Sequence, residues 1–288
     1  MRPLLLPIAA VVLAMAAFQV SAAFAKQLFP VLGPQGAAAL RLTLGALMLL
    51  ALTRPWRGLR RDAPWGALIG LGVSTGLAVL MFYAAIARLP LGVAIALQFL
   101  GPLGVALAGS RRLRDVAWAV LAAAGVWALV GRGAGEAALD PLGIAFALAA
   151  AAGWAGYILF GRVAGGAFGN AAATFATAIA AVIVLPFGVA HAGAALLTPA
   201  LLPLALMVAL FSTVIPFSLE LYAMPRMPAR TFAVFTSLEP AFGAVSGLIL
   251  LHERLAWPQA AGIAAVMLAA AGAAWSGAKE AERVPAPG

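Results

Sequence analysis

Long apolar runs separated by short polar gaps are the feature of this sequence that most limits its fold. Stretches of about twenty residues, rich in Leu, Ala, Val and Gly, match the length that an α-helix needs to cross the hydrocarbon core of a bilayer. Hydrophobic residues make up 65% of the chain and charged residues 9%, which a soluble domain of 288 residues cannot hide from water. In lipid, a helix pairs its backbone groups internally. The sequence therefore predicts an all-α integral membrane protein.

Pro, Gly and charged residues mark the breaks between the runs. They predict ten transmembrane helices, near residues 8–25, 36–53, 65–86, 91–109, 115–130, 142–162, 171–190, 200–222, 230–250 and 258–276. The first run has an alternative interpretation as a cleavable export signal, because Arg2, an apolar core and Ala23-Phe24-Ala25 fit that pattern. Cleavage would remove a helix that has a counterpart at 142–162, so we favour a retained helix.

The basic residues are distributed unevenly between the two sets of loops. The N-terminus and the even-numbered loops hold thirteen Lys and Arg residues, against four on the other side, which are Lys26, Arg88, Arg132 and Arg254. Because basic loops stay in the cytoplasm, both termini are predicted to be cytoplasmic. The net charge of +9 therefore indicates orientation and not a nucleic-acid partner. Residues 278–288 are predicted to form a short disordered cytoplasmic tail.

Several short motifs recur in order at a spacing of 138 residues, which indicates a duplication. The recurring motifs are Ser74-Thr75 with Ser212-Thr213, Arg88-Leu89-Pro90 with Arg226-Met227-Pro228, and Pro102 with Pro240. Because each unit would hold five helices, the second must enter the membrane from the opposite side. We therefore predict two inverted five-helix repeats, 1–136 and 137–277. Such repeats are frequent in secondary transporters, although channels and a few membrane enzymes also carry repeats.

Five segments of the chain carry a resemblance to a known family. They are Ala25-Lys26-Gln27-Leu28-Phe29-Pro30, Ala39-Leu40-Arg41-Leu42, Arg54-Pro55-Trp56-Arg57, Ser237-Leu238-Glu239-Pro240, and His252-Glu253-Arg254-Leu255 continuing to Gln259 and Gly262. The chain resembles the EamA family of the drug/metabolite transporter superfamily, and the first three segments are most similar to its threonine/homoserine exporter branch. This resemblance implies a ten-helix exporter of small amino acids or related metabolites in a bacterial-type inner membrane. One departure is that the first repeat has Gly101 where the second has Glu239.

Charged side chains at membrane depth cost about 2.5–3.5 kcal/mol each on insertion scales, so those retained inside helices are functional candidates. Glu239 lies near the middle of its predicted helix, where it could bind and release a proton, or form an ion pair with Arg41, or cap a helix beside Pro240. Arg41 has a planar guanidinium suited to a substrate carboxylate, with a fixed partnership to Glu220 or Glu239 as the alternative.

The remaining candidates are charged residues near helix ends, helix breaks and polar lining residues. Glu220 and Lys26 are candidates for coupling or gating, although Lys26 could instead extend to the outer interface and Glu220 could form a structural pair. Pro102 and Pro240 are predicted to break two helices at the depth where transporters bind substrate. Further candidates for lining the substrate site are Gln19, Tyr83, Gln98, Trp154, Tyr157, Tyr222 and Ser237.

Several chemistries find no support in the sequence. The chain has no G-x-x-x-x-G-K-[ST] motif, no cysteine and no histidine pair at metal-binding spacing, so we predict no cofactor, no metal site and no catalytic residues. The predicted partners are the bilayer, a small-molecule substrate and a coupling proton. The sequence thus predicts a proton-linked exporter that works by alternating access, and the alternative is a membrane-embedded enzyme or a structural membrane subunit.

Overall fold

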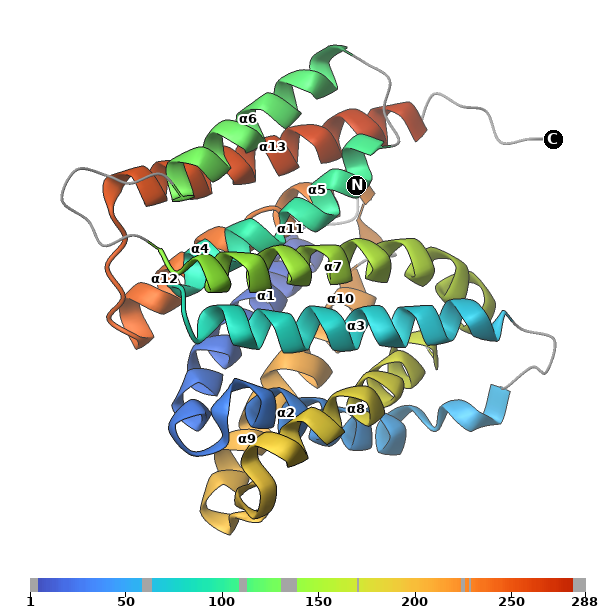
Figure 1. The fold of residues 1–288 in the computed structure, drawn as a ribbon. Helices are drawn as coiled ribbons and strands as arrows, with labels where there is room; N and C mark the ends of the chain where they lie inside the picture. Colours follow the sequence, from blue (N-terminus) through green and yellow to red (C-terminus); the bar gives the residue numbers. More distant parts are fainter. Residues whose placement is uncertain are drawn as a thin grey trace.

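The computed structural model describes residues 5–58, 64–108, 113–130, 139–169, 171–223, 226–227 and 229–281. These residues form a bundle of helices joined by short connections, and the described part contains no strand (Figure 1). The helices are α1 (Leu5–Ala25), α2 (Phe29–Thr53), α3 (Trp65–Ile86), α4 (Leu91–Gln98), α5 (Leu100–Ala108), α6 (Leu113–Val130), α7 (Pro141–Phe168), α8 (Ala171–Ala192), α9 (Leu202–Ala209), α10 (Ile215–Ala223), α11 (Ala229–Thr236), α12 (Glu239–Leu250) and α13 (Trp257–Ala281).

Helices occupy all of the ranges predicted from the apolar runs, but some ends differ. The end predicted for α7 at Arg162 is wrong, because an arginine near the interface does not break a helix, and α7 continues to Phe168 before Gly169 takes a left-handed φ of 55°. Helix α2 begins seven residues early and bends at Gly33, which has φ 62°. The predicted disordered tail begins too early, since α13 extends to Ala281; residues 282–288 lie outside the described residues.

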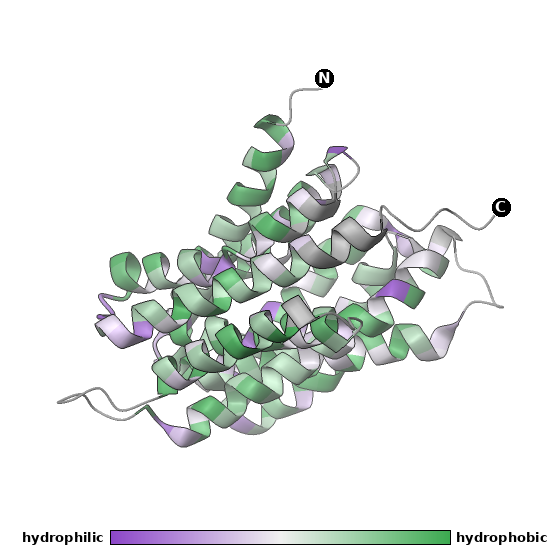
Figure 2. Cartoon of the chain, turned by 90° about the horizontal axis from the view of Figure 1, so that it is seen from above, coloured by the Kyte–Doolittle hydropathy of each residue, from purple (hydrophilic) through white to green (hydrophobic). Residues whose placement is uncertain are grey.

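The described part has seven helical stretches that are long and apolar enough to cross a membrane, judged by length and composition. One of them, Leu5–Thr53, is 49 residues long and contains both α1 and α2, and two shorter apolar helices are Val116–Val130 and Val234–Leu250. Large apolar side chains such as Trp127, 77% exposed, and Val182, 73% exposed, cover the outside of the bundle. Hydrophobic residues dominate the helices in Figure 2 as well. This surface is suited to lipid, so the chain is a multi-pass membrane protein.

The helices pack in pairs that join the two halves of the chain. Helix α3 packs along α7, α2 packs along α8, and α6 packs along α13 at one edge of the bundle (Figure 1). Helix α1 packs against α10 and α12, and α4 packs against α12. Small residues permit this closeness: a Cβ atom at Gly153 of α7 would lie 2.6 Å from the backbone nitrogen of Ala78 on α3. Long-range packing therefore holds the first and second halves together as one unit.

Three of the long helical segments that cross the bundle are interrupted near their middle. Helices α4 and α5 are separated at Phe99, and α11 and α12 are separated at Ser237 and Leu238. Between α9 and α10 lies a single π-helical turn, η5 (Leu210–Val214). Wide turns of this kind occur mostly as local irregularities inside α-helices and often at functional sites. The interruptions bring irregular backbone to the centre of the bundle.

Two ion pairs lie at the end of the bundle where α1 and α12 finish and where α4 and α7 begin. Lys26 Nζ lies 2.6 Å from Glu253 Oε1, and Glu253 Oε2 accepts a hydrogen bond from the backbone N–H of Leu91 at 2.7 Å. Glu253 therefore joins the ends of α1 and α12 to the start of α4. Nearby, Arg88 donates to Asp140, the N-cap of α7, at 2.7 Å, and together with the Leu142 N–H it lowers the pKa of the Asp140 carboxyl.

Candidate functional site

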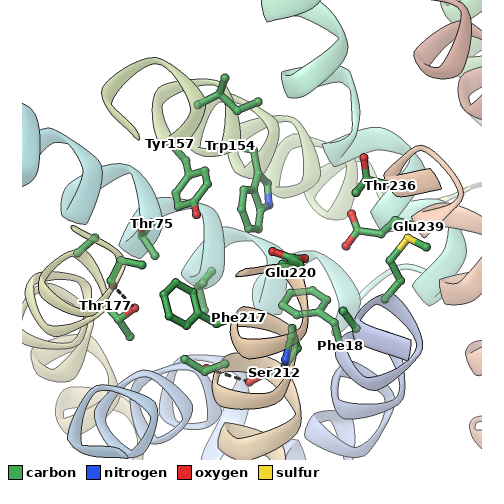
Figure 3. A pocket seen from close by; sticks show the side chains of 18 of the residues that line it. Phe18, Thr75, Trp154, Tyr157, Thr177, Ser212, Phe217, Glu220, Thr236 and Glu239 are labelled. Carbon is green, nitrogen blue, oxygen red and sulfur yellow. Dashed lines mark hydrogen bonds between the residues drawn. The ribbon is translucent and has the colours of Figure 1, made fainter. Parts of the chain in front are cut away.

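A cavity of about 460 Å³ lies inside the bundle (Figure 3). It lies between α1, α2, α3, α7 and α8 and the three interrupted helix pairs, α4 with α5, α9 with α10, and α11 with α12. This volume is within the range of about 300–1,000 Å³ that is typical of small-molecule sites. The polar and ionisable side chains that line it are Arg41, Thr75, Gln98, Trp154, Tyr157, Thr177, Ser212, Thr213, Glu220, Thr236 and Glu239. Polar and ionisable side chains are costly to bury in an apolar bundle, so this cavity is the candidate functional site.

The cavity is displaced toward one end of the bundle. Its lining reaches Leu49 near the end of α2, Ala173 near the start of α8 and Glu220 near the end of α10. These three positions share the end where α3 begins. The opposite end, which carries Lys26 and Glu253, contributes no lining residue among those described. The cavity lining therefore extends toward the end where α3 begins and not toward the end that carries Lys26 and Glu253.

Among the described residues, Arg41 is the one basic residue in the cavity lining, and its side chain is held on several sides. Its relative exposure is only 6%. Arg41 Nε donates to Ser212 Oγ at 2.8 Å, and Nη2 donates to the Ser212 carbonyl oxygen at 3.4 Å. The guanidinium carbon lies 5.1 Å from the centre of the Phe18 ring and 5.6 Å from that of Tyr83. Aromatic rings at these distances stabilise a cation without neutralising it.

Glu220 and Glu239 bring two carboxyl groups to the same cavity. Glu220 lies on α10, and Glu239 is the first residue of α12, directly after the helix break. Figure 3 shows both carboxyl groups facing the space between these helices. Among the described residues, the ion pairs are Lys26 with Glu253 and Arg88 with Asp140. Arg41 therefore pairs with Ser212 and not with either of the acids that the sequence offered as its partners.

Helix α7 supplies an aromatic wall that is tied to the first helix break. Trp154 Nε1 donates to the Gln98 Oε1 atom at 3.2 Å, and Gln98 is the last residue of α4. The rings of Trp154 and Tyr157 meet edge to face with their centres 5.2 Å apart. Figure 3 shows both rings projecting into the cavity from the same side. Gln98, Trp154 and Tyr157 were all candidates for lining the substrate site, and all three line the cavity.

The two prolines that were expected to break helices occupy the first turns of the helices that follow the breaks. Pro102 lies in α5 and lines the cavity, and Pro240 lies in α12 beside Glu239. The residue before each proline differs: Gly101 precedes Pro102, and Glu239 precedes Pro240. Packing accounts for the glycine. A Cβ atom at Gly101 would overlap the carbonyl oxygen of Ala151 on α7, so that position has no room for the carboxylate side chain that Glu239 carries.

Four of the candidate lining residues lie outside the cavity lining. Gln19 is fully buried, and neither atom of its amide has a hydrogen-bond partner among the described residues. Tyr83 is also fully buried, and the Arg41 guanidinium lies over its ring. Ser237 turns back within the break and donates to the Val234 carbonyl at 2.6 Å.

Tyr222 and Lys26 also lie away from the cavity. Tyr222 is 40% exposed and stacks under the guanidinium of Arg226 at 4.2 Å. It follows Glu220 by two residues, which on an α-helix places the two side chains about 200° apart. Lys26 contacts Glu253 at the end of the bundle where α4 and α7 begin.

Sequence reasoning missed most of the hydroxyl groups and all of the phenylalanines of the described lining. Ser212 and Thr75 were noticed only as marks of the internal repeat, and Thr177, Phe18 and Phe217 were not among the candidates. Hydroxyl groups are cheap to bury in a helix because they bond to the carbonyl one turn back, as Thr75 and Thr177 do. A serine or threonine in an apolar helix therefore does not by itself indicate whether the residue lines a site or only packs within the bundle.

A multi-pass helical membrane protein with a polar cavity at its centre and interrupted helices beside it has the architecture of a membrane transporter. The profile of the EamA-like transporter family matches this chain twice, over residues 5–131 and 141–275. The chain therefore belongs to the EamA-like transporter family, as its sequence motifs predicted.

Named relatives are similar over almost their whole length. The threonine/homoserine exporter RhtA of Escherichia coli (strain K12) is 44% identical over 278 residues, which cover 96% of this chain and 94% of the relative. The exporter of the same name from Salmonella typhimurium (strain LT2) is 44% identical over 270 residues, which cover 94% and 92%. A solved crystal structure with 19% identity superimposes with a TM-score of 0.62 over 92% of this chain and 96% of that one, which supports the fold.

Proposed function

We propose that this protein exports threonine, homoserine or a related small amino acid across a bacterial inner membrane, coupled to proton movement, by alternating access. The observation that carries the proposal is the charge arrangement in the cavity. Among the described residues, one guanidinium, on Arg41, shares about 460 Å³ with two carboxyl groups, on Glu220 and Glu239. A zwitterion, with one anionic and one cationic end, complements this arrangement. The near-full-length likeness to named exporters favours transport over the enzyme or structural-subunit alternatives.

In this proposal the groups of the cavity have different roles. Arg41 binds the substrate carboxylate, and Glu239 and Glu220 accept the substrate ammonium group or the coupling proton. Gln98, Trp154 and Tyr157 contact the remainder of the substrate. A carboxyl group that is removed from water binds a proton more readily. If one acid binds either a proton or the ammonium group of the substrate, but not both, substrate transport is coupled to proton transport.

The proposed framework is ten transmembrane helices in two inverted repeats, 1–136 and 137–277, with both termini in the cytoplasm. The packing pairs support it. In this framework α1, α2, α3 and α6 of the first half correspond to α7, α8, α10 and α13 of the second. The contact of α3 with α7 then corresponds to that of α10 with α1. The contacts of α2 with α8 and of α6 with α13 each correspond to themselves. The two family matches divide the chain at the same place.

Alternating access requires one end of the bundle to be closed while the other is open. In this orientation the cavity reaches toward the cytoplasmic end, and the ion pair between Lys26 and Glu253 lies at the outer end. We therefore assign Lys26 to gating: its bond to Glu253 holds α1 against α12 and, through the Leu91 N–H, against α4. Opening of the outer side would separate these three helices.

The topology can be tested because the chain has no cysteine of its own. Single cysteines at Gly66, where an added Cβ meets nothing within 4 Å, and at the exposed Ala194 are expected to react with a membrane-impermeant thiol reagent from opposite sides. The Gly66→Cys protein should react from the cytoplasm. Reaction of both from the same side would contradict the inverted repeats.

The activity itself is tested by counterflow in proteoliposomes. Vesicles preloaded with unlabelled threonine or homoserine are expected to accumulate the radiolabelled amino acid transiently, several times above protein-free vesicles. The corresponding amines, which lack the carboxylate, should compete poorly, because Arg41 would have no anionic partner. Vesicles that contain the intact protein and show no exchange with any small amino acid would contradict the proposal.

A further inference from the structure

The hydrogen bonds of Arg41 use only one edge of its guanidinium. A guanidinium offers two edges to a planar acceptor: a side edge, formed by Nε–H and one N–H of Nη2, and an end edge, formed by Nη1 and the second N–H of Nη2. Ser212 accepts from Nε at 2.8 Å and from Nη2 at 3.4 Å, so it occupies the side edge with two acceptors from a single residue. Within the described part of the chain, Nη1 has no hydrogen-bond partner, and the end edge stays available.

Pro216 explains why the Ser212 carbonyl can take part. In a regular helix this carbonyl would accept the backbone N–H of residue 216, four positions later, but proline has no N–H. Ser212 also lies within the π-helical turn Leu210–Val214, where the regular hydrogen-bond pattern is already altered. A side-chain hydroxyl and a backbone carbonyl of the same residue are thereby left for Arg41.

Gly45 brings this turn close enough to Arg41. It lies one turn after Arg41 on α2, and a Cβ atom there would lie 2.9 Å from Thr213 Oγ1. With no side chain at position 45, α2 and the π-helical turn approach one another directly. The Thr213 hydroxyl also lies 3.3 Å from Ser212 Oγ, so the acceptor of the Arg41 bond is itself held in place.

Two aromatic rings also hold the guanidinium. Its carbon lies over the rings of Phe18 and Tyr83, 5.1 Å and 5.6 Å from their centres. Because the guanidinium contacts both rings and its side edge is bonded, the side chain has little freedom to rotate. We propose that Ser212 is the positioning residue of Arg41, which turns the end edge of the guanidinium to the cavity as a two-donor site for one carboxylate group of an amino-acid substrate. This inference rests on the proposed function, because it assumes that Arg41 takes the carboxylate.

The chain provides a matched control for Ser212. Ser74 is the corresponding residue of the first repeat, is equally buried, and has no contact with Arg41 among the described interactions. Counterflow is compared in Ser212→Ala, Ser212→Thr and Ser74→Ala proteins. Ser212→Ala should raise the KM for the amino acid about tenfold and reduce its preference over the amine analogue, with the maximal rate little changed. Ser212→Thr, which keeps the hydroxyl, should restore both values, and Ser74→Ala should resemble the wild type.

A second measurement examines the position of Arg41 without transport. In nitrogen-15 NMR spectra of the protein in lipid nanodiscs, the Arg41 Nε resonance is identified by its absence from Arg41→Lys protein. It should shift and exchange faster with water in Ser212→Ala, but not in Ser74→Ala. An unchanged resonance, a wild-type KM in Ser212→Ala, or a Ser212→Thr protein as impaired as Ser212→Ala would each overturn the positioning role. A wild-type protein that does not distinguish the amino acid from its amine would instead overturn the proposed function and the carboxylate role with it.

Discussion

Glu239→Gln is expected to reduce transport driven by a pH gradient to the level of protein-free liposomes. Glutamine has nearly the size and shape of glutamate but cannot bind and release a proton at this position. Glu239 lines the cavity from the first turn of α12, where its carboxyl group can exchange a proton with water or a ligand in the cavity. The measurement is uptake into proteoliposomes with and without an imposed pH gradient, over a range of pH values.

Glu220→Gln is the comparison for this experiment, because Glu220 is the other acid in the same cavity. If Glu239 carries the coupling proton, Glu220→Gln should alter the affinity for substrate but keep a response to the gradient. Size-exclusion chromatography in detergent verifies that both variants fold. A Glu239→Gln protein with the wild-type pH profile would show that coupling resides elsewhere, and a lost response in Glu220→Gln alone would assign it to α10.

Arg41→Lys is expected to weaken the binding of an amino acid by about 1–3 kcal/mol, which is about five- to 150-fold in affinity. Lysine keeps the positive charge but loses the planar fork. It cannot bond to two acceptors of Ser212 and also present two parallel donors to a carboxylate. The measurement is the concentration dependence of counterflow for the amino acid and for its decarboxylated analogue.

Arg162→Lys is the control for a general effect of replacing arginine with lysine. Arg162 is exposed near the C-terminal end of α7 and does not line the central cavity. It should bind both compounds as the wild type does. If the Arg41→Lys protein binds the amino acid normally, then Arg41 serves as a point charge or as a structural residue, and the carboxylate must be held by other donors.

The existence and class of the helices could be predicted because bilayer thickness imposes a length and an apolar composition that are visible in any single helix. Local irregularities were harder. Pro102 and Pro240 indicated the interruptions before α5 and α12, because proline has no backbone N–H and removes a helix hydrogen bond. The π-helical turn at Leu210–Val214 has no such residue inside it, and only Pro216 just beyond gives a hint.

The candidate residues that stand out most clearly in the sequence are those whose burial costs most free energy. Arg41, Glu239 and Glu220 stand out in an apolar chain, and all three line the cavity. The face of a helix that lines the cavity depends on how the helix is rotated about its own axis. In an almost uniformly apolar helix, the sequence gives little information about that rotation. Tyr222 shows the consequence, because it was selected as a lining residue by its chemistry yet points away from Glu220 and contacts Arg226.

The close contact of Gly101 with α7 constrains how the two halves of such a protein can diverge. Any side chain at that position would overlap the Ala151 carbonyl oxygen, so position 101 cannot carry an acid while α5 and α7 keep this packing. The second half can hold Glu239 because its helix break faces the cavity. At this point of the fold a carboxylate is therefore confined to the second half of the chain, and the two halves differ in charge where their helix breaks correspond.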